Sequence, residues 1–503
     1  MNIKEAKEQI KNAILAYITK DEFGQYKIPI ERQRPVFLIG APGIGKTAVM
    51  EQIAQEMNLG LVSYSMTHHT RQSALGLPFI KKEEYEGQEY RISEYTMSEI
   101  LASVYKLKKE TGYEEGILFL DEINCVSETL APSMLQFLQY KTFGTHHLPQ
   151  GWIVVTAGNP PEYNRSVREY DIVTWDRLKR IDVEPDFDAW KEYAYKKGIH
   201  GAIMSFLEIK KQFFYVVEVT AEKKEFVTAR GWEDLSEMMK LYEENAIDID
   251  LKLMEQYIQN PQIAKEFSIY YDLYRKYQSD YQIQDILAGC EGEDIRTRAA
   301  RAALDERLSL LGLLLDTVDQ SMKEFMIKDA AILENLRILK FIKANLSTEF
   351  TSYTEILGNY IKEEDKKLSI GKRAGSLSKE AEYAGLYTVQ FLEKMQAELK
   401  ARRVSNNKEA FAYIKSSYDQ EVEEHKIKIN RIKDNLTHLF AFVEKVYGRD
   451  HEMLIVVSEL TVRYYCSQFI SKCGCEEYFK NNDELMFYEK RQQLLEQIDE
   501  LGQ

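Results

Sequence analysis

The stretch LIGAPGIGKTAV, Leu38–Val49, decides the fold of this chain. Residues 40–47 match the spacing G-x-x-x-x-G-K-T of a phosphate-binding loop, whose backbone N–H groups surround a polyphosphate. In such a loop the lysine, here Lys46, reaches the terminal phosphates, and the threonine, here Thr47, binds magnesium. Glycines are needed because a side chain would keep the backbone away from the phosphate oxygens. The nucleotide-binding candidates are Gly40, Ala41, Pro42, Gly43, Ile44, Gly45, Lys46, Thr47 and Ala48.

The flanks of this loop have the patterns that nucleotide binding requires. PVFLI (35–39) is continuously apolar, as a buried parallel strand is, and KTAVMEQIAQEM (46–57) has helical spacing. A strand, the loop and a helix are therefore predicted in that order. The alternative, a loop that merely turns the chain, is disfavoured because both flanking elements are present.

Composition and charge narrow the classes of function. The chain has 503 residues, which suggests roughly three domains. Its net charge of −15 argues against binding nucleic acid over the whole surface, although a local basic pore would escape this test. Nucleic acid is therefore not an expected partner.

Cysteine usage and hydropathy indicate a cytoplasmic protein. The five cysteines are scattered and odd in number, so they do not form a disulfide framework. MNIKEAKEQIKNAILAYI (1–18) has the pattern of an amphipathic helix and not of a secretory signal. The most apolar stretch, 308–315, is much shorter than the ~20 residues of a membrane span. We expect no contact with a membrane.

Short apolar runs alternate with helical patterns up to about residue 185, which is typical of a parallel sheet with helices on both faces. We predict an α/β P-loop domain over 1–185 with a five-stranded parallel sheet. The five runs are 35–39, 59–66, 116–120, 152–158 and 180–185.

Beyond that domain, helical patterns dominate. A heptad stripe of apolar residues runs through 304–325, but further leucines lie between its members, which favours a helix buried on all sides over an isolated coiled coil. The lysine-rich stretch 362–379 predicts an exposed loop or hairpin tip between long helices.

Two carboxylates follow the third predicted strand. Asp121 and Glu122 come directly after four apolar residues, at the carboxyl edge of the sheet where ligands bind in open α/β folds. Asp121 can hold the magnesium that Thr47 also contacts, and Glu122 can polarise the attacking water. The alternative is an exposed pair of carboxylates that caps the next helix.

An asparagine follows the next predicted strand. The side-chain amide of Asn159 can orient the same water without itself ionising. Asn-Pro is also a common start of a turn, so Asn159 taken alone supports either interpretation. The presence of Glu122 on the neighbouring strand favours the catalytic one.

Four motifs together resemble those of AAA+ ATPases. They are GAPGIGKT (40–47), ILFLDEIN (117–124), TAGNPP (156–161) and WDRLKRIDVEP (175–185), in the order and approximate spacing of that family. The resemblance covers roughly residues 10 to 290 and is greatest to the MoxR group. The features that point to this group are an insertion over 73–97 and a hairpin-like segment over 140–152.

The resemblance implies an ATP- and Mg²⁺-dependent ATPase that assembles as a homo-oligomer, commonly a hexameric ring. Proteins of this group remodel a partner protein, often one with a von Willebrand A domain. It also implies a helical lid over 186–290 that carries a second sensor. The remaining residues, 291–503, are then expected to form an all-helical C-terminal bundle that binds the partner.

In such a ring an arginine reaches the nucleotide of the neighbouring subunit and accelerates hydrolysis by about 10³ to 10⁵. The match to the family's D-R-F is D-R-L, which makes Arg177 the candidate arginine finger and Arg180 the second candidate. Leu178 replaces the phenylalanine, so the packing around the finger departs from the family pattern.

Arg230 is the candidate second sensor. Thr228 is a plausible N-cap, which places Arg230 in the first helical turn, where a cation is electrostatically unfavourable unless an anion is bound. The resemblance implies that this arginine touches the γ-phosphate within its own subunit. MoxR-like proteins often have proline where this chain has Ala229, and the start of a helix tolerates either residue.

The expected function is therefore ATP hydrolysis by a MoxR-like AAA+ protein that acts as a chaperone-like remodeller. Two alternatives stay open at this point. One is a nucleic-acid or GTP-driven AAA+ motor, which the acidic composition disfavours. The other is a scaffold that binds nucleotide with negligible turnover, and the intact Lys46, Asp121, Glu122 and Asn159 weigh against it.

Overall fold

The computed structural model describes residues 1–68, 71–163, 167, 170–219, 224–346, 352–404 and 406–482. By compactness the chain divides into two units. Unit 1 comprises Met1–Ala189 and Lys362–Glu382, and unit 2 comprises Trp190–Ile361 and Tyr383–Gln503. Most of the helical region beyond the predicted P-loop domain thus lies in a single unit. Across the described ranges, every helix is too short or too polar to span a bilayer.

Unit 1 is built on a five-stranded sheet in the order β2-β5-β8-β1-β9, with every pairing parallel. Each of the predicted apolar runs is one of these strands, so the predicted sheet is confirmed. The chain order reverses at β1, which lies between β8 and β9, and ligands bind beyond the carboxyl ends of strands at such a point. The strands are β1 (Val36–Gly40), β2 (Gly60–Ser65), β5 (Gly116–Asp121), β8 (Trp152–Gly158) and β9 (Lys179–Val183).

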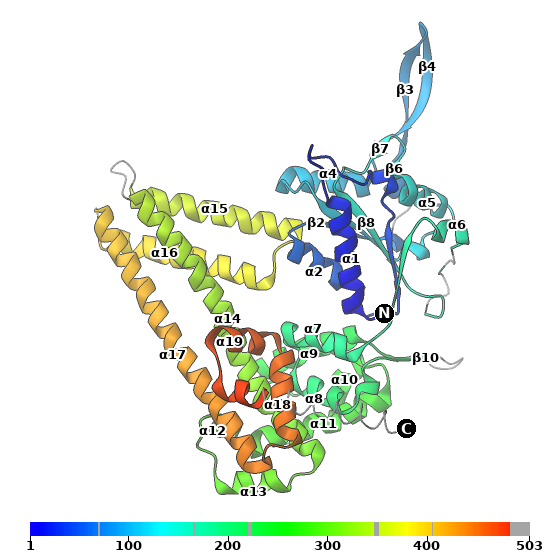
Figure 1. Ribbon diagram of the computed structural model, residues 1–503. Coiled ribbons are helices and arrows are strands. Elements are labelled where there is room, and N and C mark those ends of the chain that lie inside the picture. The colour runs from blue at the N-terminus through cyan, green and yellow to red at the C-terminus, as the bar shows by residue number, and fades with distance from the viewer. Residues whose placement is uncertain are drawn as a thin grey trace, which may run out of the picture. The chain divides into compact units, whose positions relative to one another are not determined.

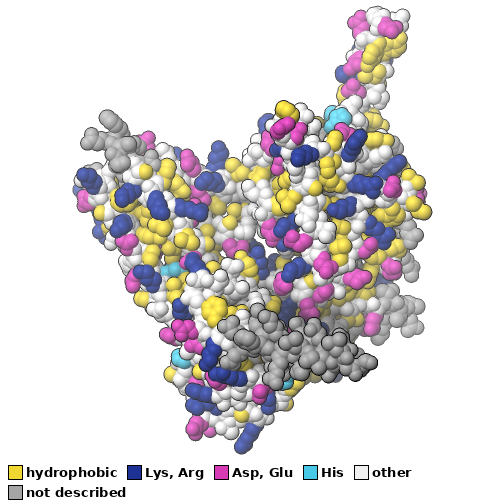
Figure 2. Space-filling model, in the orientation of Figure 1, with side chains coloured by type: hydrophobic (Ala, Val, Ile, Leu, Met, Phe, Trp, Pro, Cys, Tyr) yellow, Lys and Arg dark blue, Asp and Glu magenta, His cyan; other side chains and the backbone are white. Residues whose placement is uncertain are grey.

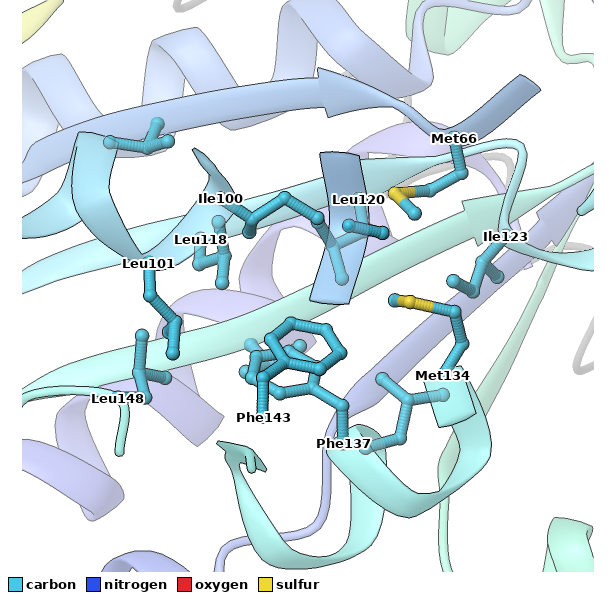
Figure 3. Close-up of a cluster of buried hydrophobic side chains, with 14 of the residues drawn as sticks. Met66, Ile100, Leu101, Leu118, Leu120, Ile123, Met134, Phe137, Phe143 and Leu148 are labelled. Atoms are coloured by element: carbon cyan, nitrogen blue, oxygen red, sulfur yellow. The ribbon is translucent and has the colours of Figure 1, made fainter. Parts of the chain in front are cut away.

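Helices cover both faces of this sheet. Leu118 and Leu120 of β5 point into a buried cluster shared with α4 and α5 (Figure 3). Ile117 and Phe119, which alternate with these leucines along β5, are also buried but lie outside that cluster. This is expected because successive side chains of a strand point to opposite faces of the sheet. Helix α2 packs against β5, and α1 packs against α2. These helices are α1 (Ile3–Ile18), α2 (Lys46–Met57), α4 (Glu99–Thr111) and α5 (Ala131–Tyr140).

Two hairpins extend from the sheet of unit 1. The insertion expected over 73–97 forms α3 (Arg71–Leu75) and the ribbon β3–β4 (Pro78–Tyr85 and Gln88–Tyr95). This ribbon projects from the sheet (Figure 1), and exposed charged and apolar side chains cover it (Figure 2). The segment expected to be hairpin-like contains the short pair β6–β7 (Thr142–Phe143 and His146–His147), which confirms that prediction.

The lysine-rich stretch 362–379 is not an extended loop. Helix α15 (Tyr353–Ala374) runs through most of it, and α16 (Lys379–Ala401) begins at its end. The turn between these helices belongs to unit 1, where the hydroxyl groups of Ser376 and Tyr113 are hydrogen-bonded at 2.8 Å. The prediction of an exposed loop was therefore wrong for most of the stretch, and a hairpin tip is present only as the short turn.

In the described part of unit 2, the elements are helices apart from the small antiparallel pair β10–β11 (Val216–Val219 and Lys224–Val227). Leu310, Leu311, Leu313 and Leu314 of α14 are all at most 3% exposed, so this helix is buried on all sides there, as predicted. It packs against α8, α11, α17, α18 and α19. The main helices are α7 (Phe187–Lys197, which begins in unit 1), α8 (Gly201–Ile209), α9 (Ala229–Glu244), α10 (Leu251–Tyr257), α11 (Pro261–Asp280), α14 (Leu304–Leu346), α17 (Asn407–Tyr447), α18 (His451–Val462) and α19 (Tyr464–Cys473).

Candidate nucleotide site

The phosphate-binding loop connects the end of β1 to the start of α2. Gly43 and Gly45 have φ angles of 74° and 92°, which is the left-handed region that favours glycine. At Gly40 the requirement is space, because a Cβ there would lie 2.6 Å from the side chain of Ile44 and 2.9 Å from the carbonyl oxygen of Val183. The loop therefore leads into the start of α2, and the first N–H groups of a helix are groups that can bind an anion.

Lys46 joins this loop to the end of β8. The residue is only 8% exposed. The ammonium group donates to the carbonyl oxygens of Gly40 and Ala41, at 2.7 and 2.8 Å, and to Oδ1 of Asn159 at 2.8 Å. The predicted phosphate ligand Lys46 and the predicted water-orienting Asn159, 113 positions apart in sequence, are thus in direct contact.

Thr47 and Asp121 form the second contact between the predicted site residues. The Thr47 hydroxyl donates to Oδ2 of Asp121 at 3.0 Å, across the gap between α2 and the end of β5. A hydroxyl and a carboxylate are hard oxygen ligands of the kind that Mg²⁺ prefers beside substrate phosphates. The two side chains predicted to hold magnesium therefore fit that role by chemistry and by proximity.

Glu122 occupies an unusual backbone position directly after β5. Its φ of 55° and ψ of 34° lie in the left-handed region, which a non-glycine residue adopts at some cost in strain. Its N–H donates to Oδ1 of Asp121 at 2.9 Å. This turn directs the two adjacent carboxylates differently, so that Asp121 contacts Thr47 while Glu122 contacts the end of β2.

The partners of Glu122, at the end of β2 and on the short 3₁₀ turn Met66–His68 after it, were not predicted from the sequence. Its Oε2 accepts hydrogen bonds from the hydroxyls of Ser65 and Thr67, each at 3.0 Å. Ser65 is in register with Asp121, because β2 and β5 are neighbours in the sheet. The sequence did place these two hydroxyl residues at the end of the second apolar run. They indicate partners for Glu122 only when β2 is known to be the neighbour of β5 in the sheet.

Arg177 and Arg180 are both exposed on unit 1. Nη1 of Arg177 donates to Oε1 of Gln139 on α5 at 2.7 Å. Arg180 lies over the ring of Trp175, at 4.8 Å from its centroid, and pairs with Asp182 at 2.8 Å. The described partners of these two arginines are thus different from those of Lys46 and Glu122. Within the described residues of unit 1, neither arginine makes a hydrogen bond or an ion pair with Lys46, Thr47, Asp121 or Glu122.

Arg230 lies in unit 2, at the second position of α9. Thr228 is the N-cap, as predicted, and its hydroxyl accepts from the N–H of Gly231 at 3.2 Å. Arg230 is exposed. The fold therefore places this cation in the first turn of a helix and in the unit that does not contain the phosphate-binding loop.

Part of the chain is similar to a known protein family. Residues 35–178 match the family described as AAA domain (dynein-related subfamily). This range contains the phosphate-binding loop, Asp121, Glu122 and Asn159 and ends at Leu178. A search of curated proteins finds no match to the chain.

Proposed function

We propose that this protein, which carries a nucleotide-binding AAA+ domain over residues 35–178, hydrolyses ATP with the help of Mg²⁺. The observation that carries the proposal is the pair of contacts at the strand ends, Lys46 with Asn159 and Thr47 with Asp121. They bring together a phosphate ligand, a water-orienting amide and two magnesium ligands. Glu122 follows Asp121 directly, so the proton acceptor lies on the same strand end.

Each residue has a separate task in this reaction. Thr47 and Asp121 would hold the metal ion, which would supply positive charge to the phosphate oxygens. Lys46 binds the terminal phosphates. Glu122 accepts a proton from the water whose oxygen attacks the γ-phosphorus, and the bond from that phosphorus to the departing ADP oxygen breaks. The amide of Asn159 orients that water.

The test of this activity is a steady-state assay with Mg²⁺ and ATP on the full chain. Glu122→Gln retains size and hydrogen bonding but removes the proton acceptor, so hydrolysis should fall about 100-fold or more while ATP still binds. Glu51→Gln, on the exposed side of α2, is the matched control and should leave the rate unchanged. Equal turnover by the wild type and Glu122→Gln would contradict the role of Glu122.

The same assay separates the alternatives. A protein that binds ATP but never turns it over would be a scaffold, whereas stimulation by DNA or a preference for GTP would indicate a nucleic-acid or GTP-driven motor. We favour the MoxR-like remodeller, because its resemblance extends to both hairpin insertions. In this proposal the helices of unit 2 bind the partner protein, and proteins with a von Willebrand A domain are the first candidates.

We further propose that the protein acts as a ring, with Arg177 reaching the nucleotide of the next subunit and Arg230 acting as the second sensor within its own. Both side chains are exposed, but Arg177 makes a hydrogen bond to the neutral amide of Gln139, whereas Arg180 pairs with the carboxylate of Asp182 and lies over the ring of Trp175. The contact of Arg177 is the easier one to exchange for a phosphate, because a hydrogen bond to a charged partner is the stronger one. Arg177→Ala and Lys46→Ala should each be inactive, and mixing them should restore some hydrolysis, because some interfaces then combine an intact site with an intact finger. No rescue in demonstrably mixed rings would favour Arg180.

A further inference from the structure

Asn124 is a buried polar residue beside the predicted catalytic groups. It lies on the short 3₁₀ turn Ile123–Cys125 that follows Glu122, and it is only 6% exposed. Its Nδ2 donates to the backbone carbonyl oxygen of Asn159 at 2.8 Å. A single side chain thus connects the turn that carries Glu122 to the residue that follows β8.

Gly158 makes room for this contact. A Cβ at Gly158 would lie 2.4 Å from Oδ1 and 2.6 Å from Cγ of Asn124, which is closer than any side chain tolerates. The φ angle of Gly158 is not positive, so the position needs glycine for space and not for backbone conformation. The side chain of Asn124 therefore lies directly against the end of β8.

The contact occurs where the sheet no longer holds the two strands together. The register between β5 and β8 ends at the pair Leu120 and Thr156. Glu122 and Asn159 both lie beyond that pair, where no ladder hydrogen bond fixes the distance between their backbones. The hydrogen bond from Asn124 to Asn159 connects the two strand ends at that point.

We infer that Asn124 is a positioning residue that sets the distance between the Glu122 carboxylate and the Asn159 amide. The inference rests on the proposed ATP hydrolysis, in which one water must meet both groups at once. Displacing a catalytic group by about 1 Å can cost about 100-fold in rate. Lys46 contacts Asn159 but also donates to the carbonyl oxygens of Gly40 and Ala41, and Thr47 contacts Asp121. Because these contacts do not depend on Asn124, its loss should affect turnover far more than nucleotide affinity.

The contact can be disturbed from both sides. Asn124→Asp has nearly the same shape but places an oxygen against the carbonyl of Asn159, and Gly158→Ala displaces the Asn124 side chain by direct collision. Both variants should lower kcat about 10- to 100-fold and leave the dissociation constant for ATP within about threefold. Asn245, the exposed C-cap of α9, also donates to a backbone carbonyl, that of Leu241 at 2.7 Å. Asn245→Asp makes the same chemical change in unit 2 and is the control, which should retain full kcat.

A double-variant cycle distinguishes positioning from general support of the fold. If Asn124 acts through Asn159, the combination of Asn124→Ala with Asn159→Ala should turn over no more slowly than Asn159→Ala alone. The inference would be overturned if the losses of kcat in Asn124→Ala and Asn159→Ala multiplied in the double variant. A normal kcat in Asn124→Asp, or an equal loss of ATP affinity and turnover, would also overturn it. A wild type that hydrolyses no ATP would refute the proposed function instead.

Discussion

At the scale of single residues, burial alone changes the pKa of one lysine in unit 1. Lys141 ends α5 and is only 3% exposed. Its ammonium group donates to the carbonyl oxygen of Leu138. Burial lowers the pKa of this lysine from 10.5 to about 7, because the charged form is poorly solvated there.

This pKa predicts a pH-dependent contribution to stability. Between pH 7 and 10.5 the unfolded chain binds a proton at Lys141 that the folded chain does not bind. The free energy of unfolding should therefore rise with pH across this window, by up to about 1.4 kcal/mol per pH unit, and the stabilisation is lost as the pH falls towards 7. Lys141→Met should be more stable than the wild type at pH 7 and lose that advantage as the pH rises.

Thermal unfolding at pH 7, 8 and 9 measures this difference. Lys109→Met, at an exposed position of α4, is the control and should follow the wild type at each pH. A Lys141→Met protein with the same dependence on pH as the wild type would mean that Lys141 remains charged in the folded state.

At the scale of elements, the packing of β2, β5 and β8 depends on a pair of glycines. Gly60, Gly116 and Trp152 are in register across these three strands. A Cβ at Gly116 would lie 2.7 Å from two atoms of the Trp152 indole and 2.7 Å from the carbonyl oxygen of Gly60. The large ring therefore packs across two strands only because neither has a side chain at that register.

Gly116→Ala should lower the free energy of unfolding by about 1–3 kcal/mol, as expected for overpacking against a backbone that cannot move aside. Denaturant unfolding of unit 1 measures this loss. Gly358→Ala is the contrasting substitution, because its new methyl group would meet only Gln396, at 3.6 Å, inside α15. The free energy of unfolding of Gly358→Ala should be unchanged or higher. Equal losses of this free energy in Gly116→Ala and Gly358→Ala would contradict the steric explanation.

At the scale of the whole molecule, unit 2 joins early and late parts of the chain through buried charges. Arg463 has a side chain that is 3% exposed and pairs with Asp316 of α14 at 2.6 Å. Its guanidinium lies 4.3 Å from the ring centroid of Tyr195 on α7. Glu459 of α18 pairs in turn with Lys191 of α7 at 2.5 Å. A cut near residue 290 would leave Lys191 and Tyr195 without these partners.

Arg463→Met should therefore destabilise unit 2 by up to about 3–5 kcal/mol, because it removes a buried cation and leaves the half-buried carboxylate of Asp316 without this partner. The control is Arg449→Met, which removes an ion pair with Glu444 whose side chains are 43% and 52% exposed and should cost less than about 1 kcal/mol. Denaturant unfolding followed by fluorescence distinguishes the two. A small effect of Arg463→Met would show that the buried network contributes little to stability.

Local patterns in the chain were enough to predict the five strands, the phosphate-binding loop, and the hairpin over 140–152. Each of these depends on residues within about ten positions of one another, whose spacing and backbone preferences act directly on local structure. The stretch 362–379 shows the limit of this reasoning, since its charges suggested a loop although most of it continues a long helix.

The contacts around the predicted site depend on chain folding over long distances. Ser65 and Thr67 meet Glu122, and Asn124 meets Asn159, only because β2, β5 and β8 are neighbours in the sheet. Strand order and the way a strand end turns arise from the packing of the whole core, and residue spacing does not encode them directly. For the same reason, the need for Gly158 became apparent only once the side chain of Asn124 was seen to lie against it.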